Sequence, residues 1–515
     1  MEITRRNFVQ GALAGAAGLS ACGLMACSLP ATGTTDESSE KNQNEVTVDR
    51  EVAETYDCDI CIVGAGFSGL IAAVQAHELG ANVLLVESNS QAGGSALNGI
   101  EGSFGIGSDM ANAQNIEVDA NAILLDEMEQ SQWRADGVGW QNMMKNSGDN
   151  INWLVEQGVR YSNVDDYHGK DYAVFHWYDG GAAAGYVEPM TARIEELGIE
   201  ALFDTKATEL IQDDAGKVVG LYADGKQGCI QVNAKAVILA TGGFAANGDL
   251  IQGYGYPDED YLCIGLPTND GSGHELAAAV GAKNMIPYTC DNAGSLIGSW
   301  GWDMSNMFFC LEPSFIWVNE SGERFFKEDN CAVNYSLQNP PKFNQESCYF
   351  LWTQGLMEQF ETEKGMEVQA SIDGVISQGA EDIVKADTIE ELAQFFGIDA
   401  QALSATVEQY NAACVAGKDD AWSKDKQYLR AYDQGPYYMC EPTFFVAVTI
   451  GSTGTNHEFQ VVTEKHEPIE GLYAIGVEGC MLYRNLYTIG TPGSCSGNSI
   501  NSARVAAQHA VETYC

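Results

Sequence analysis

The sequence predicts an α/β fold with a doubly wound sheet at its centre, and three stretches of the chain predict it. A short apolar strand at residues 59–63 runs into the pattern G-x-G-x-x-G, which an amphipathic helix at residues 71–79 follows. A second buried strand comes at residues 81–87, and a third, at residues 236–240, ends in a Thr-Gly-Gly turn. Strand, glycine-rich turn, helix and strand in this order are typical of a Rossmann-like, dinucleotide-binding unit.

The glycines of this pattern stand where a side chain would obstruct either a pyrophosphate or the packing. Gly64 makes the tight turn, Gly66 lets a pyrophosphate approach the backbone, and Gly69 lets the helix pack on the strand. The helix N-terminus offers free N–H groups and the positive end of its dipole. Glu87 lies 18 residues beyond Gly69, where a carboxylate can accept from ribose hydroxyls. The alternative is that the glycine-rich turn has a structural role only and binds no dinucleotide. The predicted contacts in this unit are Gly64, Ala65, Gly66, Phe67, Ser68, Gly69, Glu87 and Ser88.

Length and charge limit the classes of function. With 515 residues the chain has room for two or three domains and a large core. It carries 26 basic and 72 acidic side chains, a net charge of −46. Such a charge repels phosphate backbones and anionic membranes, so nucleic-acid binding is not expected. A cationic protein partner is compatible with this charge, although solubility explains it equally well.

The N-terminus predicts export. Arg5 and Arg6 precede an apolar run, rich in alanine and glycine, that reaches about Leu24 and resembles a twin-arginine signal. The run is too short, and its residues too small, for a convincing membrane span. We expect residues 1–27 to be the signal and the protein to act at the outer face of the cytoplasmic membrane or in a periplasm-equivalent space.

Two cysteines raise the question of a lipid anchor. The residues before Cys22 and those before Cys27 each resemble a lipoprotein cleavage box, so either cysteine is a candidate for lipidation. Simple cleavage without a lipid is the alternative. Residues 28–55, rich in Ser, Thr, Glu and Asn without apolar periodicity, are predicted to form a flexible linker.

The remaining cysteines predict no metal centre. Two of the 15 cysteines belong to the signal, and the other 13 show neither an iron–sulfur nor a haem spacing. Cys58 and Cys61 form a C-x-x-C pattern, but residues three apart on a strand are expected to face opposite sides. We expect both to be core residues.

Several further motifs occur in a fixed order along the chain. After the glycine-rich turn and Glu87 come A-T-G-G-F at 240–244, N-D-G-S-G at 269–273, V-N-E-S-G-E-R-F at 318–325, G-L-Y-A-I-G at 471–476 and S-G-N-S-I at 496–500. This series resembles the flavoprotein family of fumarate reductases, urocanate reductases and 3-oxosteroid dehydrogenases. The resemblance implies FAD, bound by a doubly wound domain that an α+β capping domain interrupts. It places the FAD-binding domain at 56–281 and 447–515, and the capping, substrate-binding domain at 282–446.

Further cofactor contacts follow from the loops and from the resemblance. The loop at residues 93–95 could lie against a flavin or a phosphate. Glu478 is expected to contact a ribityl or ribose hydroxyl, with a structural salt bridge as the alternative. A helix predicted from Ser496 to Tyr514 would point its first amides at the flavin pyrimidine edge, where negative charge gathers on reduction; ordinary docking of a C-terminal helix on the sheet is the alternative. These additional contacts are Gly93, Gly94, Ser95, Thr241, Gly242, Gly243, Glu478, Ser496, Gly497, Ser499 and Ile500.

Missing side chains argue against a dicarboxylate substrate. Relatives that reduce fumarate clamp two carboxylates with arginines and histidines. No arginine follows Arg324 in the window 325–335, no histidine stands in 445–451, and Gly493-Ser494-Cys495 replaces the arginine expected before the last glycine motif. The absence of these three carboxylate-binding side chains argues against fumarate as the substrate.

Aromatic residues stand near these windows instead. Tyr487 precedes a glycine-rich turn and resembles the tyrosine that hydrogen-bonds the substrate ketone in 3-oxosteroid dehydrogenases. A phenol can polarise a carbonyl or pass a proton without carrying a full charge. Packing is the alternative role for these tyrosines. The candidate catalytic residues are Tyr487, Tyr335, Arg484, Tyr483 and Tyr288.

The sequence therefore predicts an FAD-dependent oxidoreductase acting on CH–CH groups. The expected substrate is an enoate or enone, with a C=C bond conjugated to a carbonyl in an apolar, aromatic or steroid-like compound. A separate cytochrome or quinol-linked partner is expected to supply electrons. The alternatives are a 3-oxosteroid dehydrogenase, a fumarate-reductase-like enzyme for another unsaturated carboxylate, and a flavin electron carrier without turnover of its own.

Overall fold

The computed structural model describes residues 51–515, except residues 98, 168, 255–260, 485 and 489. The predicted signal, its two cysteines and nearly all of the predicted linker lie outside the described residues. In the described part of the chain, no helix has the length and apolar content that crossing a membrane requires.

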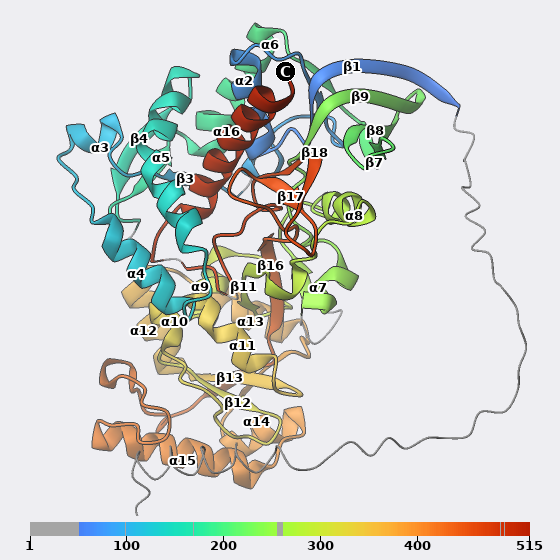
Figure 1. The fold of residues 1–515 in the computed structure, drawn as a ribbon. Helices are drawn as coiled ribbons and strands as arrows, with labels where there is room; N and C mark the ends of the chain where they lie inside the picture. The colour runs from blue at the N-terminus through green and yellow to red at the C-terminus, as the bar shows by residue number, and fades with distance from the viewer. Residues whose placement is uncertain (1–50, 98, 168, 255–260, 485, 489) are drawn as a thin grey trace, which may run out of the picture. The chain divides into compact units, whose positions relative to one another are not determined.

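An eight-stranded sheet carries the glycine-rich turn (Figure 1). Its strands are β1 (Val52–Val63), β2 (Val83–Val86), β6 (Glu200–Leu202), β7 (Lys206–Gln212), β8 (Val218–Gly225), β9 (Gly228–Leu239), β17 (Gln460–Val462) and β18 (Pro468–Ala474). The main path is β17-β18-β9-β1-β2-β6, and β8 joins β7 to β9. β1 pairs in parallel with both neighbours, so that Ile62 lies opposite Leu85 of β2 and Ile238 of β9. Residues 60–63 are all buried, as expected of a strand covered on both faces.

The two cysteines of β1 correct one sequence expectation. Cys61 is fully buried, and Cys58 is partly buried against the same hydrophobic cluster. The expectation that they face opposite sides of the strand is therefore wrong. The cause is local: the alternation of exposure along β1 changes phase at Cys58 and Asp59, both of which are half-buried. Both thiols are free.

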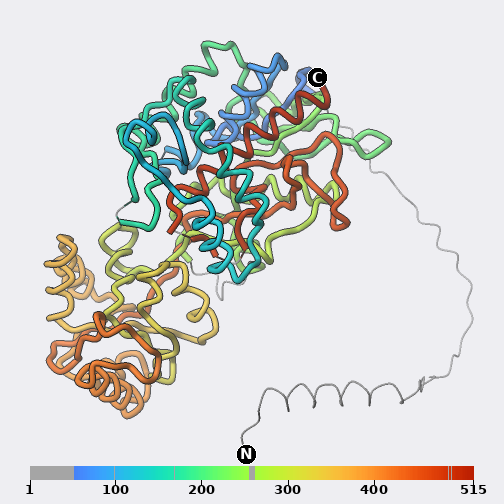
Figure 2. The backbone as a smooth tube through the Cα atoms, turned by 60° about the vertical axis from the view of Figure 1, so that its left-hand side comes forward, coloured from blue at the N-terminus to red at the C-terminus, as the bar shows by residue number. Residues whose placement is uncertain are grey.

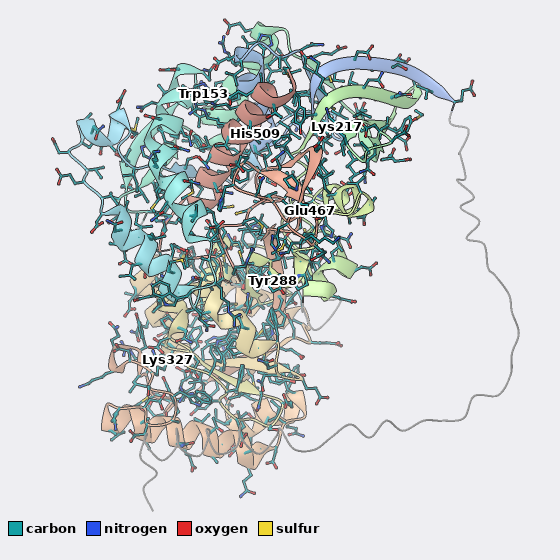
Figure 3. The ribbon with its side chains drawn as sticks, in the orientation of Figure 1. Trp153, Lys217, Tyr288, Lys327, Glu467 and His509 are labelled. Carbon is teal, nitrogen blue, oxygen red and sulfur yellow. The ribbon has the colours of Figure 1, made fainter. Side chains whose placement is uncertain are left out.

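Helices α2 (Phe67–Glu78) and α16 (Ser494–Tyr514) lie side by side on this sheet, and Figure 2 shows the C-terminal helix, in red, returning beside the first helix, in blue. Tyr473 of β18 is hydrogen-bonded to His509 of α16, with 2.7 Å between the Tyr hydroxyl and Nδ1. Figure 3 labels His509 on this helix. The guanidinium of Arg504 lies 4.7 Å from the ring centroid of Trp153 in α5 (Gly137–Glu156). These contacts fix the direction in which the N-terminus of α16 points.

A small antiparallel sheet meets that N-terminus. It consists of β3 (Gly102–Phe104), β5 (Phe175–Tyr178) and β4 (Tyr161–Asp165) in this order. Phe104 N donates to Gly493 O at 3.1 Å, and Ser496 Oγ donates to Gly102 O at 2.8 Å. Neighbouring helices are α3 (Asp109–Ala113), α4 (Ala120–Gln130) and α6 (Glu188–Leu197), the last preceded by the π-helical turn η2 (Ala183–Val187).

A three-stranded sheet leads into the predicted capping segment. Its order is β10 (Tyr261–Cys263), β16 (Thr443–Ile450) and β11 (Cys290–Leu296). β16 crosses the position 446/447 at which the sequence places a domain boundary, and it pairs antiparallel with β11 from Cys290–Ile450 to Leu296–Thr443. Helices α7 (Gly248–Tyr254) and α8 (Ser272–Ala279) and the 3-10 turn η3 (Ile286–Tyr288) lie in the chain around β10.

Residues 316–440 form a four-stranded antiparallel sheet with its own core, coloured yellow to orange in Figure 2. The strand order is β12 (Ile316–Asn319), β13 (Cys348–Thr353), β15 (Tyr437–Cys440) and β14 (Ile383–Ala386). Stacked aromatic rings fill the core, among them Trp317 against Phe350 at 4.9 Å and Phe350 against Trp352 at 5.0 Å. The surrounding short elements are α9 (Met304–Cys310), α10 (Asn330–Val333), η4 (Tyr335–Gln338), α11 (Asn339–Lys342), α12 (Gln354–Lys364), α13 (Gln369–Ser377), α14 (Ile389–Phe396) and α15 (Ala400–Ala416).

The predicted fold class is confirmed. A parallel α/β sheet with the glycine-rich turn is combined with an antiparallel α+β segment that the chain inserts between β10 and β17.

Candidate active site

The turn between β1 and α2 has the backbone that its glycines predict. Gly64 has φ +104°, and a Cβ there would lie 2.4 Å from the carbonyl oxygen of Ala240, so no other residue fits without displacing β9. At Gly69 a Cβ would lie 1.9 Å from Gly64 O, which is why the helix can rest on the turn. Gly66 is the N-cap of α2, and no side chain caps this helix. Its first N–H groups are therefore available to an anionic ligand.

Glu87 connects the end of β2 to the glycine-rich turn. Its carboxylate is buried, and Oε2 accepts a hydrogen bond from Ala65 N at 2.7 Å. Oε1 accepts from the backbone and side-chain nitrogens of Asn89, at 2.7 and 2.9 Å, and from Ser88 Oγ at 3.3 Å. Ala65 N is the single donor to Oε2 among the described residues, so this oxygen keeps a lone pair that a ribose hydroxyl can use.

The loop at residues 93–95 lies against the same turn. Gly93 N donates to Ala65 O at 2.9 Å, and Gly94 is so close to Gly66 that a Cβ on Gly94 would lie 3.1 Å from the Gly66 Cα. Ser95 Oγ accepts from Asn269 Nδ2 at 3.3 Å. The loop thus closes one side of the region next to the N-terminus of α2.

A buried carboxyl group, that of Glu478, lies opposite this turn, and its contacts show whether these residues fit FAD. Glu478 is fully buried; its Oε2 accepts a hydrogen bond from Thr241 Oγ1, and its Oε1 has no partner among the described residues. Burial raises the pKa of Glu478 to about 7, and the Thr241 hydroxyl opposes this rise. At Gly273 a Cβ would lie 1.9 Å from Thr241 Oγ1 and 2.5 Å from both Glu478 oxygens. An unpartnered carboxyl oxygen beside a position that tolerates only glycine fits a ligand rich in hydroxyls, as the ribityl and ribose parts of FAD are.

The turn after β9 joins this region to more distant parts of the chain. Phe244 N donates to Thr449 Oγ1 at 2.8 Å, and Gly271 N donates to Gly243 O at 3.3 Å. A Cβ on Gly242 would lie 3.0 Å from Asn269 Oδ1. Asn269 therefore contacts two predicted cofactor loops, although the sequence reasoning named only the motif that contains it. The available signal in the sequence is an asparagine that opens a glycine-rich turn motif, since such side chains often bond nearby backbone.

Helix α16 begins two residues before the predicted start. Gly493 is the N-cap with φ +73°, and no side chain caps the helix. Because Gly497 N already donates to Gly493 O at 2.8 Å, the free amides belong to the first turn, Ser494 to Ser496. Ser499 Oγ donates to Cys495 O at 3.0 Å, and Ile500 is fully buried in the core under the sheet.

The segment before α16, residues 476–493, contains no helix or strand in its described part and carries three of the predicted catalytic residues. Tyr483 is buried; its hydroxyl donates to Ser494 Oγ at 2.7 Å, and its ring meets Trp140 edge-on at 5.6 Å. The structure therefore places Tyr483 in the packing around the segment. Tyr487 meets Tyr483 edge-on at 5.2 Å.

The hydroxyl of Tyr487 has no hydrogen-bond partner among the described residues, whereas its carbonyl oxygen accepts from Asn334 Nδ2 at 3.1 Å. Burial raises the pKa of Tyr487 well above its ordinary value, and the nearby Cys495 and Tyr335 add to this rise. Tyr487 is therefore a neutral phenol at physiological pH, with a proton to donate.

Tyr335 is brought to the same interior by η4. Its hydroxyl donates to Asn292 Oδ1, and burial raises its pKa. Asn334 is fully buried and caps η4, with its Oδ1 accepting from Ser336 N at 3.0 Å. The sequence did not point to Asn292, nor to the hydrogen bond from Asn334 to the segment that carries Tyr487. Both contacts join distant segments, and no local sequence pattern indicates such a contact.

Arg484 supplies a cation next to these phenols. Its Nη1 donates to Tyr483 O at 3.4 Å, and no salt bridge to Arg484 is found within the described part of the chain. Burial lowers the pKa of its guanidinium, against the opposing influence of Cys480 and Asp136. Tyr288 lies at the end of η3, where Figure 3 labels it, and 52% of its surface is exposed. It acts on the Arg484 guanidinium and is more exposed than Tyr487 and Tyr335.

Comparison with known proteins agrees with this geometry. The sequence profile of the FAD binding domain family matches residues 59–491. The chain is 31% identical to vinyl phenol reductase of Lactiplantibacillus plantarum over 481 residues, covering 88% of this chain and 96% of the relative. It is 29% identical to urocanate reductase of Eggerthella lenta over 442 residues, covering 82% and 70%.

A solved structure shows the same fold. The chain is similar to a 3-ketosteroid-delta4-(5alpha)-dehydrogenase from Rhodococcus jostii, crystallised with 4-androstene-3,17-dione, with a TM-score of 0.67 and 24% identity. The match covers 90% of this chain and 99% of that one, so both the doubly wound sheet and the inserted α+β segment are included.

Proposed function

The chain belongs to the FAD binding domain family and is an FAD-dependent oxidoreductase acting on carbon–carbon double bonds, and we propose that it reduces such a bond in an uncharged aromatic substrate. The double bond is conjugated to a carbonyl group or to a phenol ring. The observation that carries the proposal is the Tyr487 hydroxyl, a neutral donor without a protein acceptor among the described residues, beside the second neutral phenol of Tyr335. The extensive match to a vinyl phenol reductase supports an aromatic substrate.

The residues that would hold FAD are those around the glycine-rich turn, the loop at residues 93–95, Glu87, Glu478 and the first turn of α16. Bound FAD supplies a hydride to one carbon of the double bond. The amides of the first turn of α16 offer partial positive charge to an anion, and the free lone pairs of Glu87 and Glu478 accept from hydroxyls.

Tyr487 polarises the substrate. When the double bond is conjugated to a carbonyl, hydride addition to its far carbon places negative charge on the carbonyl oxygen. When it is conjugated to a phenol ring, the terminal carbon takes its proton first, and hydride addition to the carbon next to the ring then returns an electron pair to the ring and its oxygen. A phenol O–H aimed at that oxygen stabilises the charge, and burial strengthens the hydrogen bond because little water competes for it. Arg484 adds a positive field from a guanidinium that forms no salt bridge within the described residues, although the charge of Asp136 acts on it.

Tyr335 completes the addition. Reduction of the double bond adds one hydride and one proton, so the second carbon must take a proton from an acid. We assign this proton to the Tyr335 hydroxyl, which Asn292 orients, and the resulting phenolate regains a proton from solvent. Two electrons are consumed per turnover, and we propose that a cytochrome or a quinol-linked protein delivers them to the flavin.

A single unpaired cation also argues against dicarboxylates. Holding two carboxylates takes two or more charged donors, because each buried carboxylate needs its own partner. In the described part of the segment 476–493, which carries Tyr487, Arg484 is the one guanidinium. We therefore propose that fumarate is a poor substrate.

The test uses the purified, FAD-loaded protein with reduced methyl viologen as electron donor. We expect consumption of viologen with 4-vinylphenol or with uncharged aromatic enones, and little with fumarate. Viologen oxidation limited to one flavin equivalent with every compound would identify an electron carrier and contradict the proposal. Formation of an unsaturated product from a saturated 3-oxosteroid, with no reduction of any enone, would instead assign the dehydrogenase direction.

We also propose that the protein acts outside the cytoplasm, with or without a lipid on Cys22 or Cys27. The support is the arginine pair and the apolar run of the N-terminal residues. Arg5→Lys together with Arg6→Lys should leave flavin-loaded protein in the cytoplasm. Unchanged export of this double variant would exclude the twin-arginine route, and fatty-acid labelling of Cys22→Ala and Cys27→Ala decides the lipid question.

A further inference from the structure

A buried carboxyl lies directly behind the segment that carries Tyr487. Glu127, on α4, is 1% exposed, and each of its two carboxyl oxygens is 2.5 Å from Thr488 Oγ1. Thr488 is also 1% exposed, and it follows Tyr487 in the chain. The two partners are 361 residues apart in sequence, and neither belongs to a cofactor motif.

Apart from the buried hydroxyls of Thr488 and Thr491, the described surroundings of Glu127 are apolar and lack a compensating cation. Ile123, one helical turn before it, belongs to the hydrophobic cluster that contains Tyr483 and against which Tyr487 packs. The titratable groups that act on it are Asp126 from α4 itself, Tyr172 from the chain before β5, and Tyr483 from the loop. Within the described residues no Lys, Arg or His forms a salt bridge with Glu127.

This environment controls the protonation of Glu127. Burial is the largest influence and raises its pKa to about 7. The hydroxyls of Thr488 and Thr491 favour the ionised carboxylate and lower the pKa, but burial outweighs both, and the charge of Asp126 raises the pKa further. Protonated and ionised forms are therefore both populated near neutral pH. A protonated carboxyl can donate its own O–H to Thr488 as well as accept, whereas an ionised carboxyl can only accept.

The loop depends on such side-chain anchors for its position. Since residues 476–493 have no helix or strand in their described part, no backbone ladder fixes them. The anchors include Tyr483 to Ser494, Asn334 to the Tyr487 carbonyl, and Thr488 to Glu127. Adjacent Cα atoms are about 3.8 Å apart, so a displacement of Thr488 is passed directly to Tyr487.

We propose that Glu127 is a positioning residue for Tyr487: its neutral carboxyl holds Thr488 in place, and its ionisation releases the loop and switches turnover off. The inference rests on the proposed role of Tyr487. Its physical reason is that an ionised carboxylate without a cationic partner is costly in this interior, and the cost exceeds what the hydroxyls of Thr488 and Thr491 return, so the chain relaxes to admit water. The neutral carboxyl of Glu127 dominates below the pH at which half of this group is ionised. Activity is therefore lost as the pH rises past that point.

The first experiment measures turnover against pH for the full-length, FAD-loaded protein with reduced methyl viologen and 4-vinylphenol, or the best compound of the panel. We expect wild-type turnover to fall about tenfold or more from about pH 6 to about pH 8.5. Glu127→Gln, which stays neutral, should keep turnover within about threefold of the wild type at the lower pH and show no such fall. Asp126→Asn, a matched neighbour, should move the fall in turnover to lower pH, because removing its charge eases the ionisation of Glu127.

Two outcomes would overturn the proposal. One is a Glu127→Gln protein whose turnover falls with pH as in the wild type. The other is a folded, flavin-loaded Glu127→Gln protein that is inactive at every pH.

A second pair of variants covers the case in which Glu127→Gln fails to fold. Thr488→Ser keeps the hydroxyl and should keep the wild-type profile. Thr488→Val keeps the shape without the hydroxyl, and should lower turnover at low pH and flatten the profile. Identical profiles for Ser and Val at this position would overturn the proposal.

Infrared spectroscopy gives a readout that does not depend on activity. In the FAD-loaded protein, a carbonyl stretch of a protonated carboxyl should titrate near neutral pH in the wild type, be missing from Glu127→Gln in the difference between the two spectra, and shift in frequency in Thr488→Val. Absence of such a band in the wild type overturns the proposal.

Tyr487→Phe distinguishes failure of the proposed function from failure of the inference on Glu127. Wild-type turnover in Tyr487→Phe would contradict the proposed function. If Tyr487→Phe is slow but the pH profile of Glu127→Gln is the same as that of the wild type, only the inference on Glu127 is contradicted.

Discussion

The carbonyl oxygen of Tyr487 accepts a hydrogen bond from Asn334 Nδ2 at 3.1 Å, across 153 residues of sequence. Asn334 belongs to the inserted α+β segment, and it immediately precedes Tyr335 in the chain. One buried amide therefore ties together the two segments that carry the proposed polarising and proton-donating phenols.

Asn334→Ser tests this link. Serine retains the N-cap of η4, because a short hydroxyl can accept from Ser336 N, but it cannot reach the Tyr487 carbonyl. Loss of a buried hydrogen bond of about 1–2 kcal/mol predicts a fall in turnover of roughly 5- to 30-fold, with FAD content preserved. Steady-state kinetics and the flavin absorbance of the purified variant measure both. Wild-type turnover in Asn334→Ser would show that the link is dispensable.

Glu478→Gln tests the hydroxyl acceptor of the FAD site. Hydrogen bonds from FAD hydroxyls favour the carboxylate, so binding lowers a pKa that burial holds at about 7 in the free chain. FAD affinity should therefore increase as pH rises from about 5 to about 7 and then level off. The Gln variant cannot ionise; it should bind FAD about 10- to 100-fold more weakly at about pH 8 and without this pH dependence.

Quenching of flavin fluorescence on titration of the FAD-free protein measures these affinities. Glu467→Gln is the matched control, because it makes the same change on an exposed side chain (Figure 3). Equal FAD affinity and equal pH dependence in wild type and Glu478→Gln would remove Glu478 from the site.

Gly273→Ala tests the shape of the same site. A Cβ at this position would collide with Thr241 Oγ1 and both Glu478 oxygens, although Ala is by itself the better residue for a helix such as α8. We expect a folded protein that has lost most of its FAD. Gly253→Ala, in α7 with open space around its Cβ, is the control and should retain FAD fully. Full FAD retention in Gly273→Ala would contradict the assignment of this cradle.

The sequence was sufficient for those features that short-range patterns encode. Strand periodicity and the spacing from Gly64 to Glu87 predicted the core of the sheet and its turn, because these constraints act within about 30 residues, the size of one βαβ unit. The N-terminus of α16 was predicted to within two residues, since small polar residues precede a long helical run.

Features that depend on tertiary packing were not predictable in this way. A glutamate in a helix is normally exposed, so Glu127 gave no signal until the fold placed Thr488 against it. Tyr483 and Tyr487 are four residues apart in the same loop, and the resemblance alone favoured Tyr487. The structure bonds the hydroxyl of Tyr483 to Ser494 and leaves that of Tyr487 without a partner among the described residues. Which way a loop side chain points is decided by contacts distant in sequence.

Tyr487→Phe, measured beside Tyr483→Phe, tests the central claim most directly. Both changes remove one hydroxyl and keep the ring, so packing and FAD content should survive in each. The measurement is kcat of the FAD-loaded proteins with reduced methyl viologen and the best aromatic substrate of the panel. Loss of a hydroxyl that stabilises developing charge predicts that kcat falls by about 10²-fold or more in Tyr487→Phe. Tyr483→Phe loses one buried hydrogen bond that anchors the loop, worth about 1–2 kcal/mol, so its kcat should fall by no more than roughly 5- to 30-fold. A Tyr487→Phe protein that turns over at the wild-type rate would contradict the account.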